Sequence, residues 1–182
     1  MGKVYEQLEP PVADFLRQQR LFFVATAPLA ADGRVNLSPK GMDTFAVVDA
    51  QTVAYLDLTG SGIETVAHLR ENGRIVLMFC AFEGPPKIVR LHGLGEVLEP
   101  GDDDFDAHRT LFGTFPGVRS IVRVRVTRVS DSCGYAVPLF QYVEDRDQLT
   151  QWADRKGEAG VEEYQARNNA HSIDGLPGLR NR

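Results

Sequence analysis

The order of apolar and polar residues predicts β-strands along most of the central part of the chain. The clearest pattern is "VRVRV" at residues 122–126, where valine and arginine alternate strictly, as in a strand with one buried and one exposed face. Residues 74–82, "RIVLMFCAF", are almost wholly apolar, which predicts a strand covered on both faces. Further runs of β-prone residues bounded by turn formers lie at 22–26, 34–38, 44–48, 52–58 and 87–99. Gly93 and Gly95 predict a bend or a β-bulge in the last of these runs.

Helix signals occur first near the N-terminus and then after the fourth predicted strand. Val12, Phe15 and Leu16 recur at helical spacing over about residues 11–19, after two prolines that suit a first helical turn. In "GSGIETVAHLRENG", Ser61 and Glu64 have the spacing of a capping box. Gly73, at the end of that stretch, predicts the left-handed residue that follows a helix.

Three more helices are predicted in the second half of the chain. Residues 102–115 begin with three aspartates, and acidic side chains are favourable at a helix N-terminus. Residues 144–157 and 160–170 predict two C-terminal helices separated by glycines. This order of elements predicts a mainly β protein with flanking helices, arranged as a small antiparallel barrel rather than a doubly wound sheet.

Composition and charge exclude several classes of protein. The formal net charge of −5 argues against binding to nucleic acid or to an anionic membrane surface, because both require a basic face. No export signal precedes the first predicted helix, and no apolar run is long enough for a membrane-spanning helix. With two distant cysteines, Cys80 and Cys133, we expect a reduced, cytoplasmic protein whose thiols are structural.

The common catalytic and metal patterns are absent from the sequence. No serine lies in a G-x-S-x-G nucleophile elbow, and the four histidines lack metal-ligand spacing. We therefore predict no metal site, and we assign no catalytic residue.

The stretch "DGRVNLSPKG" carries polar side chains at positions of equal parity. Arg34, Asn36, Ser38 and Lys40 can share one face of a strand, and Pro39 interrupts ladder pairing there. A guanidinium, a hydroxyl and an ammonium group together suit a phosphate. Alternatively, Lys40 is an ordinary surface lysine.

A second polar group lies in "TGSGIET", at the predicted start of a helix. Free backbone amides and the helix dipole favour anions at such a position, and Thr59, Ser61 and Thr65 add hydroxyl groups. Alternatively, Ser61 only caps the helix. The two groups together predict a site for a phosphate-bearing ligand.

Four stretches of this chain resemble the flavin-binding split-barrel proteins related to pyridoxamine 5′-phosphate oxidase. They are "FFVATAPLAADGRVNLSPKG", "DLTGSGIETVAHLRENGRIVLMF", "KIVRLHGLGEVL" and "RVRVTRVSDSCGYAVP", which together span about residues 20–138. The resemblance implies a six-stranded antiparallel split barrel that forms a homodimer, with FMN in a cleft between the subunits. Residues 1–144 would form the barrel, and residues 145–182 a helical extension and docked tail of the same domain. Asn36, Ser38 and Lys40 would face the flavin.

The chain departs from the oxidase pattern at one important position. Oxidases carry an Arg-Lys pair at the start of the helix, whereas Gly62 and Ile63 stand here. The resemblance then implies that Arg34, Lys40 and Arg90 supply the positive charge for the phosphate. The substrate-binding pattern of the true oxidase is also not recognisable in the C-terminal part, so we do not expect oxidation of pyridoxamine phosphate.

The leading hypothesis is an FMN-dependent oxidoreductase that acts on a small molecule of undetermined identity. Alternatives are a deazaflavin-dependent reductase, a haem protein with His92 or His68 as axial ligand, and a non-enzymatic flavin-binding or flavin-sensing dimer. Tyr135 and the "SIDGLPG" tail at residues 172–178 are candidates to line or cover the flavin. Core packing of Tyr135 is the competing interpretation.

Overall fold

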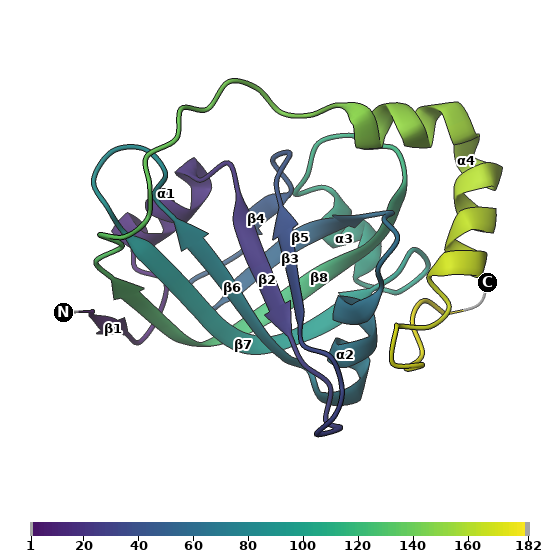
Figure 1. Cartoon of the computed structure of the whole chain (residues 1–182), viewed down its shortest axis with the longest axis horizontal. Coiled ribbons are helices and arrows are strands. Elements are labelled where there is room, and N and C mark those ends of the chain that lie inside the picture. The colour runs from purple at the N-terminus through teal and green to yellow at the C-terminus, as the bar shows by residue number, and fades with distance from the viewer. Residues whose placement is uncertain (1, 181–182) are drawn as a thin grey trace.

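A computed structural model describes residues 2–180 as one curled antiparallel sheet with four helices around it (Figure 1). The strands are β1 (Val4–Tyr5), β2 (Phe22–Thr26), β3 (Asn36–Lys40), β4 (Phe45–Val47), β5 (Thr52–Leu58), β6 (Arg74–Cys80), β7 (Ile88–Leu98) and β8 (Val118–Ser132). The helices are α1 (Pro10–Gln18), α2 (Glu64–Asn72), α3 (Phe105–Arg109) and α4 (Gln148–Asn168).

The sheet has two free edges that curl towards each other. Its order is β3-β2-β6-β7-β8-β5-β4, with β1 paired to β8, and every pairing is antiparallel. The ring of Phe45 on β4 lies 5.4 Å from that of Phe22 and 4.8 Å from that of Phe79, on strands near the opposite edge. The sheet is therefore a barrel split between β3 and β4, as expected. It has eight strands instead of six, two of them only two and three residues long.

The core fills the inside of the curled sheet. Val24, Leu77, Phe79 and Leu91 are fully buried there, and Leu16 of α1 closes one end. Each such side chain stabilises the fold by roughly 1.5–3 kcal/mol through loss of apolar surface to water. The site described below lies at the open side of this rigid core.

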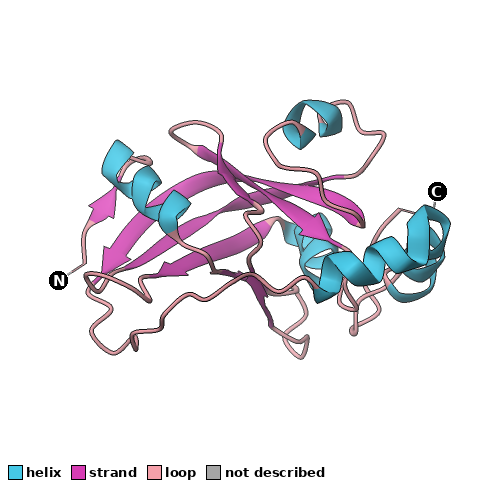
Figure 2. Ribbon diagram, turned by 90° about the horizontal axis from the view of Figure 1, so that it is seen from above, coloured by secondary structure: helices cyan, strands magenta, loops and turns pink. Residues whose placement is uncertain are grey.

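The helices cover different parts of the barrel. α2 packs across β2, β6 and β7, whereas α1 packs near β4. An extended segment, residues 133–147, runs from the end of β8 along one side of the molecule to α4, which lies at the opposite end from α1 (Figures 1 and 2). Across residues 2–180, no helix combines the length and apolar character needed to cross a membrane.

Several local predictions are confirmed. α1 occupies the expected residues, Gly73 has the left-handed φ of 71° after α2, and the register of β7 against β8 shifts between His92 and Gly93. Two C-terminal helices were predicted, and α4 does consist of two helical parts, because it is broken at Gly157. The φ of 66° and ψ of 171° at this residue suit glycine.

Other local predictions are wrong. The predicted capping box does not form: α2 starts after Ile63 without a side-chain cap, and the Glu64 carboxylate accepts from the backbone of Ile173 instead. The strand expected at 34–38 lies two residues later. β6 is not covered on both faces, because Val76 and Met78 remain partly exposed. The helix expected over 102–115 is limited to α3.

Candidate functional site

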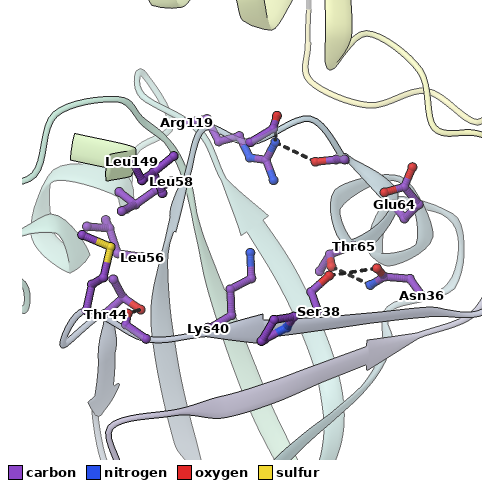
Figure 3. Close-up of a pocket in the computed structure, with 15 residues that line it drawn as sticks. Asn36, Ser38, Lys40, Thr44, Leu56, Leu58, Glu64, Thr65, Arg119 and Leu149 are labelled. Carbon is purple, nitrogen blue, oxygen red and sulfur yellow. Dashed lines mark hydrogen bonds between the residues drawn. The ribbon is translucent and has the colours of Figure 1, made fainter. Parts of the chain in front are cut away.

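A pocket of about 320 Å³ opens where the barrel is split (Figure 3). Its walls come from β3 and the turn after it, from β5 and β8, from the loop before α2, and from the first turns of α2 and α4. The lining residues are Asn36, Ser38, Pro39, Lys40, Gly41, Met42, Thr44, Leu56, Leu58, Gly60, Gly62, Glu64, Thr65, Arg119 and Leu149. A pocket of this size is at the lower end of the range for small-molecule sites.

The edge strand β3 presents its polar residues to the pocket because side chains alternate along a strand. Asn36, Ser38 and Lys40 face inwards, whereas Leu37 is 65% exposed on the other face. β3 pairs only with β2, so Pro39 is tolerated there despite its missing N–H. Met42, with a left-handed φ of 64°, then turns the chain sharply towards β4.

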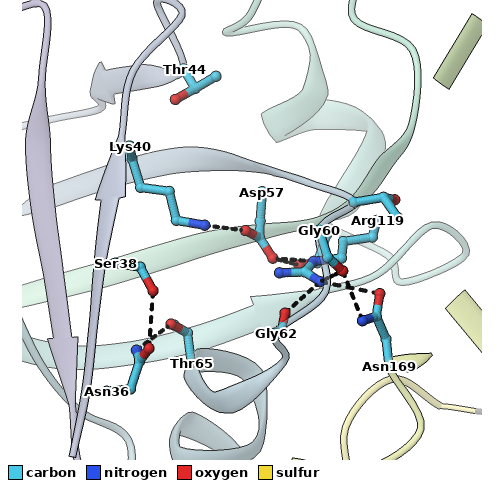
Figure 4. A network of polar contacts seen from close by, with 12 residues as sticks. Asn36, Ser38, Lys40, Thr44, Asp57, Gly60, Gly62, Thr65, Arg119 and Asn169 are labelled. Carbon is cyan, nitrogen blue, oxygen red and sulfur yellow. Dashed lines mark hydrogen bonds and ion pairs between the residues drawn. The ribbon is translucent and has the colours of Figure 1, made fainter. Parts of the chain in front are cut away.

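Asp57 of β5 joins the two basic residues of the pocket. Its carboxylate accepts from Lys40 Nζ at 2.7 Å and from Arg119 Nε at 2.7 Å (Figure 4). Burial raises the pKa of Asp57, but the charges of Arg119 and Lys40 outweigh it and hold this pKa well below its usual range. The carboxylate is therefore ionised, and the three residues together carry one net positive charge.

Arg119 reaches Asp57 because of a β-bulge. Asp57 pairs with Ser120 and Leu58 pairs with Val118, so Arg119 is the residue left between them. A bulge redirects the side chain of its extra residue. Arg119 thus enters the site from β8 although only 6% of it is exposed.

The loop of residues 59–63, named here the 59–63 loop, is held by its carbonyl groups. Arg119 Nη1 donates to Gly60 O at 3.3 Å and to Gly62 O at 2.8 Å. The Asn169 amide donates to Gly60 O at 3.0 Å. Within residues 2–180, the backbone amides of residues 60–63 and Arg119 Nη2 have no hydrogen-bond acceptor. Of the residues that carry these donors, Gly60, Gly62 and Arg119 line the pocket.

A second polar network runs from the pocket into the core. Ser38 Oγ donates to Asn36 Oδ1 at 2.9 Å, and Asn36 Nδ2 donates to the hydroxyl oxygens of Thr65 at 2.9 Å and Thr26 at 3.1 Å. Ser38 therefore offers an acceptor to the pocket, while Thr65 keeps its own proton to donate.

This network ends at a buried histidine. His68 Nδ1 lies 3.0 Å from Thr26 Oγ1, and the side chain is fully buried. Burial lowers the pKa of His68, although the charges of Glu64, Glu71 and Asp174 oppose this. Nε2 of His68 has no partner in the described part of the chain.

Comparison with known proteins identifies the family. The family model described as pyridoxamine 5′-phosphate oxidase matches residues 8–133. A curated protein of Aspergillus flavus, "Pyridoxamine 5′-phosphate oxidase family protein ustO", is 40% identical over 195 aligned residues, which cover 96% of this chain and 77% of that protein. The chain belongs to the pyridoxamine 5′-phosphate oxidase family.

Solved structures of the same fold agree with this assignment. HupZ from Group A Streptococcus superposes with a TM-score of 0.51 at 22% identity, covering 66% of this chain and 90% of that one. A protein of Mesorhizobium loti named FAD-binding superposes with a TM-score of 0.51 at 16% identity, covering 72% and 96%. At these identities the likeness establishes the fold only.

Four of the residues predicted to bind the cofactor lie together in the pocket of this family member: Asn36, Ser38, Lys40 and Thr65. Thr59 is buried beside them, where its hydroxyl donates to Gly117 O at 2.7 Å.

Other predicted residues lie elsewhere. Arg34 is exposed and paired with Asp174 of the tail at 2.5 Å, and Ser61 is exposed and does not line the pocket. Arg90 Nη1 donates to Ser132 Oγ at 3.2 Å, away from the pocket. Tyr135 is 82% exposed, so the alternative interpretation that it packs in the core is wrong.

Sequence analysis missed three residues that organise the site, namely Asp57, Arg119 and Asn169. A signal existed for Asp57, because an acid within the apolar strand "TVAYLDL" requires a buried partner. Arg119 looks like the surface arginines that follow it in β8, and Asn169 lies in a polar helix end. Only the tertiary contacts distinguish them.

Proposed function

We propose that this pocket binds FMN, with the phosphate at the 59–63 loop and the flavin ring along β3. The observation that carries the proposal is a set of hydrogen-bond donors without an acceptor in residues 2–180, namely Arg119 Nη2 and the backbone amides of residues 60–63. They lie next to Lys40, Arg119 and Asp57, which together carry one net positive charge. Such a set fits a phosphate group. The name of the Mesorhizobium loti protein, FAD-binding, supports a flavin in a protein of this fold.

Different residues of the pocket would bind different parts of FMN. Lys40 and Arg119 would hold the phosphate, with the amides of the 59–63 loop. Ser38, as an acceptor, would contact an N–H or O–H of the ring or ribityl chain rather than the phosphate, and Thr65 would donate to an acceptor. Bound FMN would supply the electron chemistry of an oxidoreductase, while the protein binds and orients it.

Pyridoxamine phosphate is not the substrate that we propose. The substrate-binding pattern of the true oxidase is not recognisable in the C-terminal part of this chain. A haem is also disfavoured, since no histidine is among the lining residues. The deazaflavin and non-enzymatic alternatives remain outcomes of the tests below.

We further propose that a second copy of the chain covers the flavin in a homodimer. Support comes from apolar side chains that are exposed in one copy, on the segment of residues 133–147 and beside β3. They are Val35, Leu37, Tyr135, Leu139 and Val143, each 65% or more exposed. Sedimentation equilibrium would test this; a monomer at micromolar concentration would contradict it.

The proposed function is tested by the visible spectrum of the purified protein and by titration with FMN and with riboflavin. We expect a retained flavin band and FMN binding at least about tenfold tighter than riboflavin, because charge-assisted hydrogen bonds to phosphate contribute roughly 1.5–3 kcal/mol. Lys40→Ala should reduce this preference, whereas Lys156→Ala, on α4, should not. A protein that binds neither flavin, or binds both equally, would refute the phosphate site. Deazaflavin binding in place of FMN would favour the reductase alternative.

A further inference from the structure

Asn169 follows the last residue of α4 and is fully buried against the 59–63 loop. Both ends of its side-chain amide are used. Its Oδ1 accepts from Arg119 Nη1 at 3.1 Å, and its Nδ2 donates to Gly60 O at 3.0 Å (Figure 4). A buried amide satisfied at both ends holds its partners in one arrangement.

A residue within α4, Gln165, supports the same loop. Gln165 Nε2 donates to Thr59 Oγ1 at 2.7 Å, and Thr59 Oγ1 donates to Gly117 O at 2.7 Å. Asn169 and Gln165 both lie outside the stretch that the family model matches, residues 8–133. The loop therefore depends on contacts from a part of the chain that the family pattern does not include.

These contacts fix the direction of the loop amides. In a trans peptide the C=O and the following N–H point in opposite directions. Gly60 O points to Asn169 and Arg119, and Gly62 O points to Arg119. The N–H groups of Ser61 and Ile63 consequently point away from Arg119, and that of Ser61 also points away from Asn169. Neither has a protein acceptor within residues 2–180.

Arg119 is fixed in the same way. Its Nε and Nη1 are occupied by Asp57, the loop carbonyls and Asn169, which leaves Nη2 as the free donor. Without Asn169, the guanidinium would lose the partner that stands opposite Asp57. In the proposed FMN site, Arg119 would take the place of the missing basic pair only in this orientation.

We propose that Asn169 is a positioning residue that locks Arg119 and the 59–63 loop in their phosphate-binding arrangement, so that the extension, through Asn169, is part of the cofactor site. This inference rests on the proposed FMN site. It goes beyond that proposal because it gives the C-terminal extension a role in affinity.

The extension has enough other contacts to stay docked when Asn169 is changed. Arg70 donates to Gly178 O and pairs with Glu99. Arg34 pairs with Asp174, and Arg180 of the extension pairs with Glu99 at 3.5 Å. A variant at position 169 is therefore expected to fold, and loss of affinity can be separated from loss of structure.

The test compares Asn169→Ala with Asn168→Ala, its neighbour, whose amide donates only to Tyr164 O within α4 at 2.9 Å. Gln165→Met is a second, milder variant that removes the bond to Thr59. For each folded variant, FMN and riboflavin affinities are measured by flavin fluorescence. We expect Asn169→Ala to weaken FMN binding about tenfold and riboflavin binding about twofold or less. Gln165→Met should have a smaller effect in the same direction, and Asn168→Ala should affect neither ligand.

An unchanged FMN-to-riboflavin ratio in folded Asn169→Ala overturns the inference, and so does an equal loss in Asn168→Ala. If the unmodified protein itself has no preference for FMN, the proposed function fails instead. Amide hydrogen exchange in the ligand-free proteins then still tests the lock. Faster exchange at the Thr59 amide, which donates to Gly117 O at 2.8 Å, in Asn169→Ala but not in Asn168→Ala supports it, and unchanged exchange there overturns it.

Discussion

Lys40 Nζ lies 2.7 Å from Asp57 Oδ1, and this ion pair joins the free edge strand β3 to β5, beside the other edge of the split barrel. The same carboxylate binds Arg119. One buried acid thus holds two cations of the proposed ligand site at a fixed spacing before any ligand binds. Such preorganisation reduces the cost of ordering side chains on binding.

Asp57→Asn is expected to destabilise the protein strongly. The substitution leaves Lys40 and the buried Arg119 without a counter-charge, and breaking a buried pair in this way costs about 3–5 kcal/mol. Urea unfolding at pH 7 measures the change. Asp32→Asn, an exposed aspartate, is the control and should be neutral; equal effects would mean that Asp57 is not a structural ion.

The contribution of Asp57 should also depend on pH. Its pKa is lower in the folded protein than in the unfolded chain, where an aspartate titrates at about 3.9. Its stabilisation is therefore complete above that value and is lost as the pH falls further. The stability difference between the unmodified protein and Asp57→Asn should shrink below about pH 4. A difference that stays constant down to pH 3 contradicts the ion pair.

His68 is expected to destabilise the fold in mild acid. Burial lowers its pKa below the ordinary value of 6.5, despite the nearby carboxylates of Glu64, Glu71 and Asp174. The neutral imidazole is favoured by the fold, so its stabilisation is complete above pH 6.5 and is lost as the pH falls below it. Melting temperatures at pH 7.5 and about 5.5 measure this loss. The decrease in melting temperature between these two pH values should be absent in His68→Gln. A decrease of unchanged size in that variant would mean that other groups cause it.

Tyr55→Phe should be neutral or stabilising by up to about 1 kcal/mol, because it removes a buried polar group without a partner. The Tyr55 hydroxyl makes no well-formed hydrogen bond in residues 2–180. Burial raises its pKa well above 10.0, and the nearby Thr65 hydroxyl opposes this shift. The ring itself packs at 5.7 Å from that of Phe22. Tyr55→Leu, which loses the ring, should destabilise in the same urea assay. Clear destabilisation by Tyr55→Phe would show that the hydroxyl is satisfied after all.

The ion pair between Arg34 and Asp174 is expected to hold the tail without supporting the whole fold. Asp174 accepts from the Arg34 backbone at 2.7 Å and from its guanidinium at 2.5 Å, which lower its pKa in that order. Asp174→Asn should therefore speed protease cleavage within residues 171–180 and leave the melting temperature unchanged. Asp154→Asn, on the exposed face of α4, serves as the control. Cleavage at the unmodified rate would mean that other contacts hold the tail.

Much of the fold was predictable because its signals are local. Alternation located β8, runs of β-prone residues between turn formers located β2, β5 and β7, and the glycines at positions 73 and 93 marked a helix end and a bulge. The absence of the capping box was not predictable, because the Glu64 carboxylate accepts a hydrogen bond from the backbone of Ile173, which is 109 positions away. Local spacing cannot weigh a cap against such a distant partner.

The sequence by itself determined which side chains of β3 face the pocket. Asn36, Ser38 and Lys40 share a face through the period of two, whatever the rest of the chain does. The motifs around them also pointed to the correct family. Both results depend only on residues that are neighbours along the chain.

Only the tertiary structure decided which charges complete the site. Arg119 and Asp57 are 62 positions apart, and Asn169 is a further 50 from Arg119. A single bulge selects Arg119 from the arginines of β8, and the docking of α4 brings Asn169 to it. Sheet register and helix docking are set by the packing of the whole core, so no local pattern in the sequence contains them.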